Sequence, residues 1–224
     1  MDGERHLRPR DRVFLAVCVV VAAVSLSLGV YLFPKANPEA SIRFDLDRKQ
    51  SESVALRFLD RAGVHSADAM GEGSHDLSGW HHASRFVYDD DARVFLEREV
   101  GLEETGRLVT GPVRMWRWGH RWFRPLQKET FLVEVATTGK VARFEHEIDE
   151  DAPGAHLSRE RAQAVAESLA TALLGFDPAR LELLDAQTQD RKARTDHVFV
   201  WKDPSIRVAD GSYRYEIGIQ GDRL

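Results

Sequence analysis

The sequence predicts an α+β protein in which one N-terminal transmembrane helix precedes a soluble domain. Three features predict this fold class: a long uncharged apolar run near the N-terminus, two amphipathic helical stretches, and alternating strand patterns after each of them. Of the 224 residues, 43% are hydrophobic and 30% are charged, which is typical of a globular chain with one or two domains. We therefore expect a soluble part made of two modules, each a helix with an antiparallel sheet.

These patterns divide the chain into five segments. We expect a cytoplasmic tail over 1–12, a transmembrane anchor over 13–33, a linker over 34–46, a first α+β module over 47–152 and a second α+β module over 153–224. The second module is expected to be incomplete, because its last strand pattern stops at the chain end without a partner strand.

The apolar run over 13–33 carries no charged residue. At about 1.5 Å per residue, a helix of this length spans the roughly 30 Å hydrocarbon core of a bilayer. Four arginines precede the run, whereas only Lys35 follows it closely. The excess of positive charge places the tail in the cytoplasm and the rest of the chain outside it, in a single-pass cell-membrane protein. The lipid bilayer is the expected partner of this segment.

A cleaved signal sequence is the competing interpretation. Its apolar region is usually about 7–15 residues long and is followed by a small-residue cleavage site, and neither feature is present here. A lipoprotein signal at Cys18 has too few apolar residues before it, and Val17 occupies the position of a small residue. Cys18 is also the only cysteine, so an intrachain disulfide and a cysteine-based zinc site are excluded.

The first module begins with an amphipathic helix over 47–62, which Asp47 or Ser51 caps and Gly63 ends. A loop rich in glycine and histidine follows over 63–79. Next we expect a strand over 81–88 and a short helix over 92–100, capped by Asp91 and stopped by Gly101; then strands over 113–123, 130–136 and 141–148, the last two forming a hairpin at Gly139.

The second module begins with a helix that Ser158 caps and Gly175 ends. Its apolar stripe consists of Ala162, Val165, Ala166, Leu169 and Leu173. Strands are expected over 181–188, 196–202 and 212–219. Both opening helices share a serine followed by alanine four residues later, which indicates a weak internal repeat.

Tryptophan and arginine alternate in the strand over 113–123. Trp116, Trp118 and Trp122 share one face, and arginines lie between them. This pattern is compatible with binding to single-stranded nucleic acid or to lipid headgroups, and equally with tryptophans that fill a core. Because the net charge is −5, no nucleic acid partner is expected, and the alternation favours the core.

Nine histidines raise the question of a metal site. His81 and His82 are adjacent in a strand and therefore face opposite sides, and His146 between Glu145 and Glu147 has the same geometry. The acidic runs 89–91 and 147–151 do not match a calcium-binding loop. We expect no metal and no cofactor.

Asp196 and His197 are the only candidates for a catalytic pair. Arg191, Lys192 and Arg194 lie close to them in sequence, which favours a structural ion pair instead. No serine or cysteine nucleophile occupies a recognisable turn, so no catalytic residue is assigned.

The segments RPLQKETFLVEVATTGKVARFEHEIDEDAPGAHLSRERAQAVAE, RTDHVFVWKD and YRYEIGIQGDRL resemble the extracytoplasmic N-terminal region of bacterial CPBP-family intramembrane proteases. The helix-then-hairpin units also resemble PepSY-like modules, which are small binding or inhibitory domains near proteases. The first resemblance implies a non-catalytic module of a membrane-embedded protease, or one associated with it in cis or in trans. The alternative is a free-standing, membrane-anchored binding or structural protein.

The chain departs from the catalytic motifs of that family. E-E-x-x-x-R would lie on a membrane helix, whereas Glu103, Glu104 and Arg107 are spaced one residue too closely in a soluble segment. No catalytic residue is therefore carried over. Gly221 and Asp222 predict a turn, and a partner strand is expected to begin at Arg223. We therefore expect the chain to be the front of a longer protein, itself an intramembrane protease. The alternative is that the domain ends with an edge strand.

Overall fold

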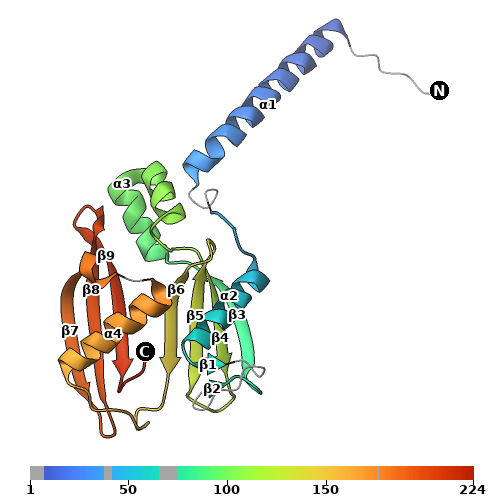
Figure 1. The fold of residues 1–224 in the computed structure, drawn as a ribbon. Helices are drawn as coiled ribbons and strands as arrows, with labels where there is room; N and C mark the ends of the chain where they lie inside the picture. The colour runs from blue at the N-terminus through green and yellow to red at the C-terminus, as the bar shows by residue number, and fades with distance from the viewer. Residues whose placement is uncertain (1–7, 38–41, 66–74, 176) are drawn as a thin grey trace.

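The computed structural model describes residues 8–37, 42–65, 75–175 and 177–224. It is an α+β structure in which one long helix projects from a sheet-rich body (Figure 1). Most of the predicted glycine- and histidine-rich loop, and most of the predicted cytoplasmic tail, lie outside the described residues.

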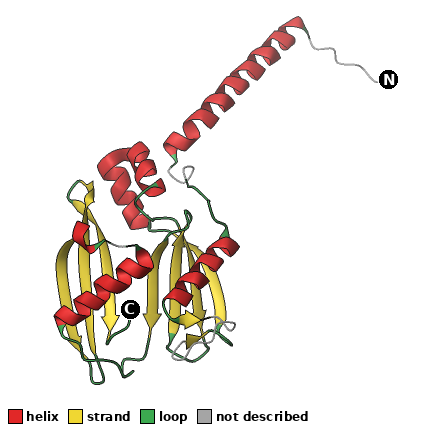
Figure 2. Ribbon diagram, viewed as in Figure 1, coloured by secondary structure: helices red, strands yellow, loops and turns green. Residues whose placement is uncertain are grey.

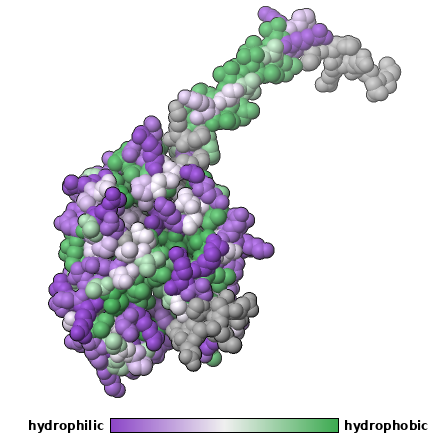
Figure 3. Space-filling view, viewed as in Figure 1, coloured by the Kyte–Doolittle hydropathy of each residue, from purple (hydrophilic) through white to green (hydrophobic). Residues whose placement is uncertain are grey.

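Helix α1 (Pro9–Ala36) contains the apolar run, and its side chains are exposed throughout Pro9–Phe33. It is long and apolar enough to cross a membrane, which fits an anchor or a signal sequence. Figure 3 shows it as a hydrophobic rod beside a body of mixed polarity. The helix continues three residues beyond the expected end of the anchor at 33.

The first sheet has the strand order β3-β4-β5-β6, with every pair antiparallel. Its strands are β3 (His81–Val87), β4 (Arg117–Phe123), β5 (Thr130–Ala136) and β6 (Val141–Glu147). Helix α2 (Arg48–Arg61) begins at an N-cap on Asp47, and Phe58 and Leu59 pack against Phe131 and Val133 of the sheet. A short parallel pair, β1 (Val64–His65) with β2 (His75–Asp76), follows α2.

The second sheet consists of β7 (Glu182–Asp190), β8 (Thr195–Val208) and β9 (Gly211–Gln220), in that order and antiparallel. Helix α4 (Arg159–Leu174) covers one face of it, after which a short 3-10 turn, η2 (Pro178–Arg180), leads into β7. The buried helix residues are all alanines, which let α4 lie close to the large side chains of the sheet. These contacts involve Ala162, Ala166 and Ala170 of the helix with Phe199, Trp201, Ile217 and Ile219 of the sheet.

Helix α3 (Asp90–Thr110) links β3 to β4 within the first sheet and contacts β8 of the second sheet. Asp89 caps it rather than Asp91. The helical conformation is broken at Gly101, where the short helix was expected to stop, but a second helical stretch that was not expected follows the break. Gly101 has φ 77°, so it produces a kink that a glycine accepts readily, and the helix resumes after it. Leu96 and Val109 of α3 pack with Trp116 and with Val208 of β8, which forms a third apolar core.

The two sheets lie side by side, with α2 and α4 on the same face (Figure 2). β6 and β9 are the neighbouring edges, and their arrows run in the same direction (Figure 1). Leu174, the last residue of α4, packs against the cores of both sheets. The edges are therefore held next to each other from the helix side.

Several expected signals coincide with the structure. Ser158 caps α4, Gly175 ends it in the left-handed conformation, and Gly139 has φ 93° in the β5–β6 hairpin. β8 runs six residues beyond its expected end at 202, and β4 begins four residues later than expected. The division of the body into two modules remains a prediction.

Candidate functional site

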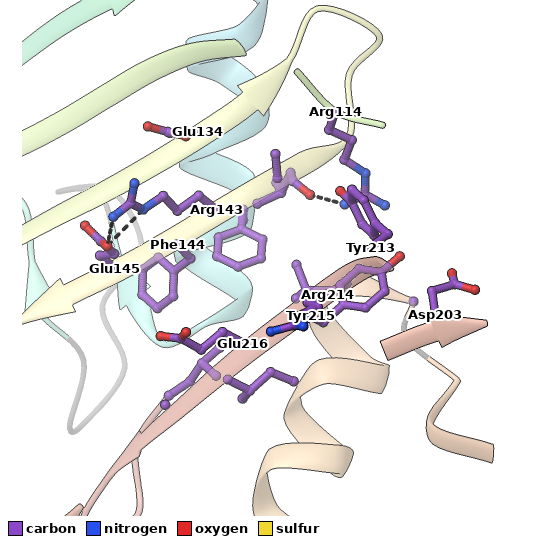
Figure 4. Close-up of a pocket in the computed structure, with 18 of the residues that line it drawn as sticks. Arg114, Glu134, Arg143, Phe144, Glu145, Asp203, Tyr213, Arg214, Tyr215 and Glu216 are labelled. Atoms are coloured by element: carbon purple, nitrogen blue, oxygen red, sulfur yellow. Dashed lines mark hydrogen bonds and ion pairs between the residues drawn. The ribbon is translucent and has the colours of Figure 1, made fainter. Parts of the chain in front are cut away.

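A cleft of about 950 Å³ lies between the facing edges of β6 and β9 (Figure 4). β6 forms one wall and the stretch Tyr213–Gly218 of β9 forms the other. Phe58 and Phe144, whose ring centroids are 5.3 Å apart, contribute the apolar surface on the α2 side. Leu174 and Ile217 continue this surface on the α4 side.

The backbone of β9 presents hydrogen-bonding groups to this cleft. The Gly221 N–H donates to the Thr195 carbonyl of β8, and N–H directions alternate along an antiparallel strand. The even-numbered residues therefore direct their N–H and C=O away from β8. At Gln220, the last of these residues, the backbone N–H and C=O are already hydrogen-bonded to Arg223. Arg214, Glu216 and Gly218 remain, and they pair with no other backbone in the part of the chain that is described.

The edge of β6 is only partly occupied. On β5, the Ala136 N–H donates to the Lys140 carbonyl, so the even-numbered residues of β5 point toward β6. Glu134 then bonds across to Arg143, and the next residue of β6, Phe144, directs its backbone into the cleft. At the far end, the Arg114 guanidinium donates to the Val141 carbonyl at 2.5 Å (Figure 4).

Charged side chains of both signs line the cleft. Arg143 pairs with Glu145 on β6. Arg117 Nε lies 2.7 Å from Glu134 Oε2, and Glu134 is only 2% exposed. Neither of these two atoms makes an aligned hydrogen bond, so the contact is an ion pair set by distance alone. The balance of charge favours neither a cation nor an anion as ligand.

Tyr215 lies on the β9 wall, beside Tyr213. Burial raises the pKa of its phenol, and the neighbouring Tyr213 acts in the same direction. The hydroxyl therefore stays protonated at neutral pH and remains able to donate a hydrogen bond.

A second polar cluster lies between α2 and the first sheet. Ser51 Oγ is 2.9 Å from His120 Nε2, and His120 Nδ1 is 3.1 Å from His82 Nε2. His82 Nδ1 in turn lies 3.3 Å from a carboxylate oxygen of Glu52. The four side chains form one continuous chain from a hydroxyl to a carboxylate.

The direction of the protons in this chain follows from its first member. The Ser51 hydroxyl donates to the Arg48 carbonyl at 2.8 Å, so its oxygen accepts from His120 Nε2. His120 Nδ1 then has no proton and accepts from His82 Nε2. His82 Nδ1 faces the Glu52 carboxylate, which is the last member of the chain. Burial, helped by the nearby charges of His82 and Arg48, lowers the pKa of His120 to about 4.

This chain resembles a nucleophile–base arrangement but lacks access to a substrate. Ser51 and His120 are both 0% exposed. The cluster therefore holds α2 to the sheet. The alternation in the sequence places His120 on the same inner face as Trp118 and Trp122, which indicates a buried histidine. A buried histidine requires hydrogen-bond partners, but the sequence does not identify them.

Asp196 and His197 do not form a catalytic pair. Asp196 accepts from Arg191 Nε at 3.0 Å and from Arg194 Nε at 2.8 Å. His197 instead lies 3.0 Å from Thr188 Oγ1 and 3.0 Å from the Leu157 carbonyl. Both residues are buried in a network that ties β8 to the segment before α4.

The other sequence candidates are dispersed. His81 stacks on Phe123 while His82 stacks on Trp122, so they occupy opposite faces of β3. His146 bonds to Glu129. Across the described ranges, no three His, Cys, Asp or Glu side chains are placed to hold a metal ion. Trp116 and Trp122 are buried, as expected for core residues.

Comparison with protein-family models, curated proteins and solved structures found no match to this chain. The resemblance to CPBP-family proteases and to PepSY-like modules therefore stays a prediction.

Proposed function

We propose that this chain is a non-catalytic, membrane-anchored binding module that captures an extended polypeptide segment in the β6–β9 cleft. Helix α1 would be the anchor, with the body of two helix-and-sheet modules on the extracytoplasmic side. The observation that carries the proposal is the pair of facing strand edges with unpaired backbone groups on both sides of one cleft.

An extended peptide has the chemistry that this cleft offers. Strand addition uses main-chain hydrogen bonds for affinity and side-chain contacts for selectivity. β6 and β9 run in the same direction, so one strand inserted in the opposite direction would form antiparallel ladders with both (Figure 1). Every second side chain of the inserted strand would face the helix side and contact the rings of Phe58 and Phe144. A bound strand would join the two sheets into one.

We further propose that the captured segment belongs to a membrane-embedded protease of the CPBP type, or to a protein delivered to one. The support is the sequence resemblance together with an anchor that would keep the cleft beside the membrane. Affinity purification of the full chain from detergent-solubilised membranes of its native cells would test this. Recovery of a polytopic protease supports the proposal, and its loss with a cleft variant would assign the contact to the cleft. If no protease is recovered, the free-standing binding protein becomes the better interpretation.

Gly218 offers a sharp test of strand addition. Its N–H points into the cleft, and a Cβ added there would meet nothing within 4 Å. Gly218→Pro removes this donor and leaves the ladder to β8 intact, whereas Gly218→Ala keeps the donor and is the matched control. Peptides are first selected from a random dodecapeptide phage library against the full chain in lipid nanodiscs. Their affinities are then measured by fluorescence anisotropy.

We expect Gly218→Ala to bind as the wild type does and Gly218→Pro to bind about tenfold more weakly, the equivalent of one hydrogen bond. Circular dichroism melting of each variant confirms that the fold is retained. Equal affinity of both variants for the selected peptides would rule out strand addition at β9. Selection of no peptide at all would contradict the proposed binding function.

A further inference from the structure

An aromatic cluster lies at the end of the first sheet where β3 finishes and β4 begins. Phe86 is 5.1 Å from Trp118 and 5.7 Å from Phe44, measured between ring centroids. Tyr88 joins through Trp116, at 5.7 Å. The rings are thus in continuous contact.

The outer members of this cluster are exposed. Phe44 is 58% exposed, Tyr88 53% and Phe86 36%. We call these three side chains the aromatic patch. Trp116 and Trp118 lie beneath them; Trp116 is buried, and the Trp118 indole donates to the Leu46 carbonyl at 3.2 Å. The patch therefore has a rigid base and presents its rings to the outside.

The patch is close to the end of α1. Seven residues separate Ala36, the last residue of α1, from Phe44, and a chain of that length reaches at most about 30 Å. Tyr88 is followed directly by α3, which contacts α1. Figure 1 shows α3 and the start of α2 on the side of the body that faces α1. α3 adds three exposed apolar residues, Val94, Phe95 and Leu102.

We infer that the aromatic patch docks on the surface of the bilayer that α1 crosses. The inference rests on the proposed anchoring by α1. Two features select the bilayer over a protein partner. The anchor's apolar run ends at Phe33, so the patch is held within reach of the interface in every molecule. Tyr88 has the apolar body and polar edge of the aromatic side chains that are enriched at that depth of a membrane, and the rings of Phe44 and Phe86 add apolar surface beside it.

Docking would fix how the body stands on the membrane. A tether of a few residues leaves a domain free to rotate, whereas a tether together with three rings at the interface defines an orientation. The β6–β9 cleft would then be presented at a constant angle to the membrane surface.

The test uses single-cysteine versions of the full chain in nanodiscs that hold one copy each. Cys18→Ser removes the native thiol, and Phe44→Cys or Tyr88→Cys is labelled with an environment-sensitive fluorophore. Lys49→Cys, an exposed site in the first turn of α2, controls for simple closeness to the anchor. Leu126→Cys, fully exposed in the β4–β5 turn at the opposite end of the sheet, is the distant control.

We expect lipid-borne quenchers to quench the labels at Phe44 and Tyr88 at least about twofold more than the label at Lys49, with protection from aqueous iodide. The label at Leu126 should respond only to iodide. Equal quenching at Phe44, Tyr88 and Lys49 would overturn the inference. Resistance of the chain to extraction by alkaline carbonate is measured in parallel, so a failure of anchoring is distinguished from a failure of docking.

Discussion

Nε2 of His82 lies 3.1 Å from Nδ1 of His120, and the two rings stack with an interplanar angle of 14°. Only one of two such close imidazoles accepts a second proton readily, because a like charge beside it opposes ionisation. The buried His120 is the ring that stays neutral.

This arrangement predicts a loss of stability in mild acid. The pKa of His120 is about 4 in the folded chain against an ordinary value of 6.5, so between these pH values the unfolded state binds more protons. The stabilisation is complete above pH 6.5 and is lost as the pH falls toward 4, by roughly 3 kcal/mol at most. Urea unfolding followed by tryptophan fluorescence at pH 7.5, 5.5 and 4.5 measures it. His120→Gln should flatten the dependence, whereas the control His81→Gln should not.

Replacement of Trp116 with alanine should destabilise the fold by about 3–5 kcal/mol, because its buried ring would leave a cavity among Leu96, Val109 and Val208. Trp118→Ala should cost less, since that side chain is only partly buried. Thermal melting of the full chain in detergent checks both. Unchanged melting of Trp116→Ala, with loss of liposome binding, would instead assign the strand to the membrane surface.

Asp196→Ala should act on stability alone. Arg194 is 2% exposed and would lose the carboxylate that pairs with it, though it would keep its bonds to the Asp149 and Ala152 carbonyls. A loss of roughly 3 kcal/mol follows from the unpaired buried charge. Denaturant titration measures this loss. Any hydrolytic activity of the purified chain that disappears in both Asp196→Ala and His197→Ala would contradict the non-catalytic assignment.

Gly221→Ala should be more harmful than Gly175→Ala, although both glycines have φ near 65°. An alanine Cβ at 221 would meet the Ala155 nitrogen at 2.8 Å, whereas at 175 it would meet nothing within 4 Å. The strained backbone alone costs about 1 kcal/mol, and the clash with another backbone adds to it. Equal melting temperatures of the two variants would show that the segment before α4 moves away freely.

Local sequence signals were sufficient for much of this fold. A serine cap and a terminal glycine bounded α4, and a glycine turn located the β5–β6 hairpin, because each depends on neighbours within a few residues. The break at Gly101 was predicted from the glycine itself, whereas the helical stretch of α3 that follows it was missed. The extension of β8 past 202 was missed because Pro204 argues against a strand; the register with β9 is in fact interrupted between Asp203 and Arg207 and resumes at Arg207.

The cleft could not be predicted from the sequence. It exists because β6 and β9, which lie about 70 residues apart, become neighbouring edges, and no local pattern encodes that placement. The histidine chain was missed for a similar reason: Ser51 and His120 are 69 positions apart and meet only when α2 packs on β4.

Leu174 packs against the apolar cores of both sheets on one side of the cleft. Val208, at the turn between β8 and β9, is buried in the third core beneath α3. The sheets are thereby fastened at two separate points, and neither can detach without exposing apolar surface belonging to the other. Heat or denaturant should consequently melt the whole body in one cooperative transition rather than two. The fluorescence of Trp122 and that of Trp201, one in each sheet, would then show the same midpoint of unfolding.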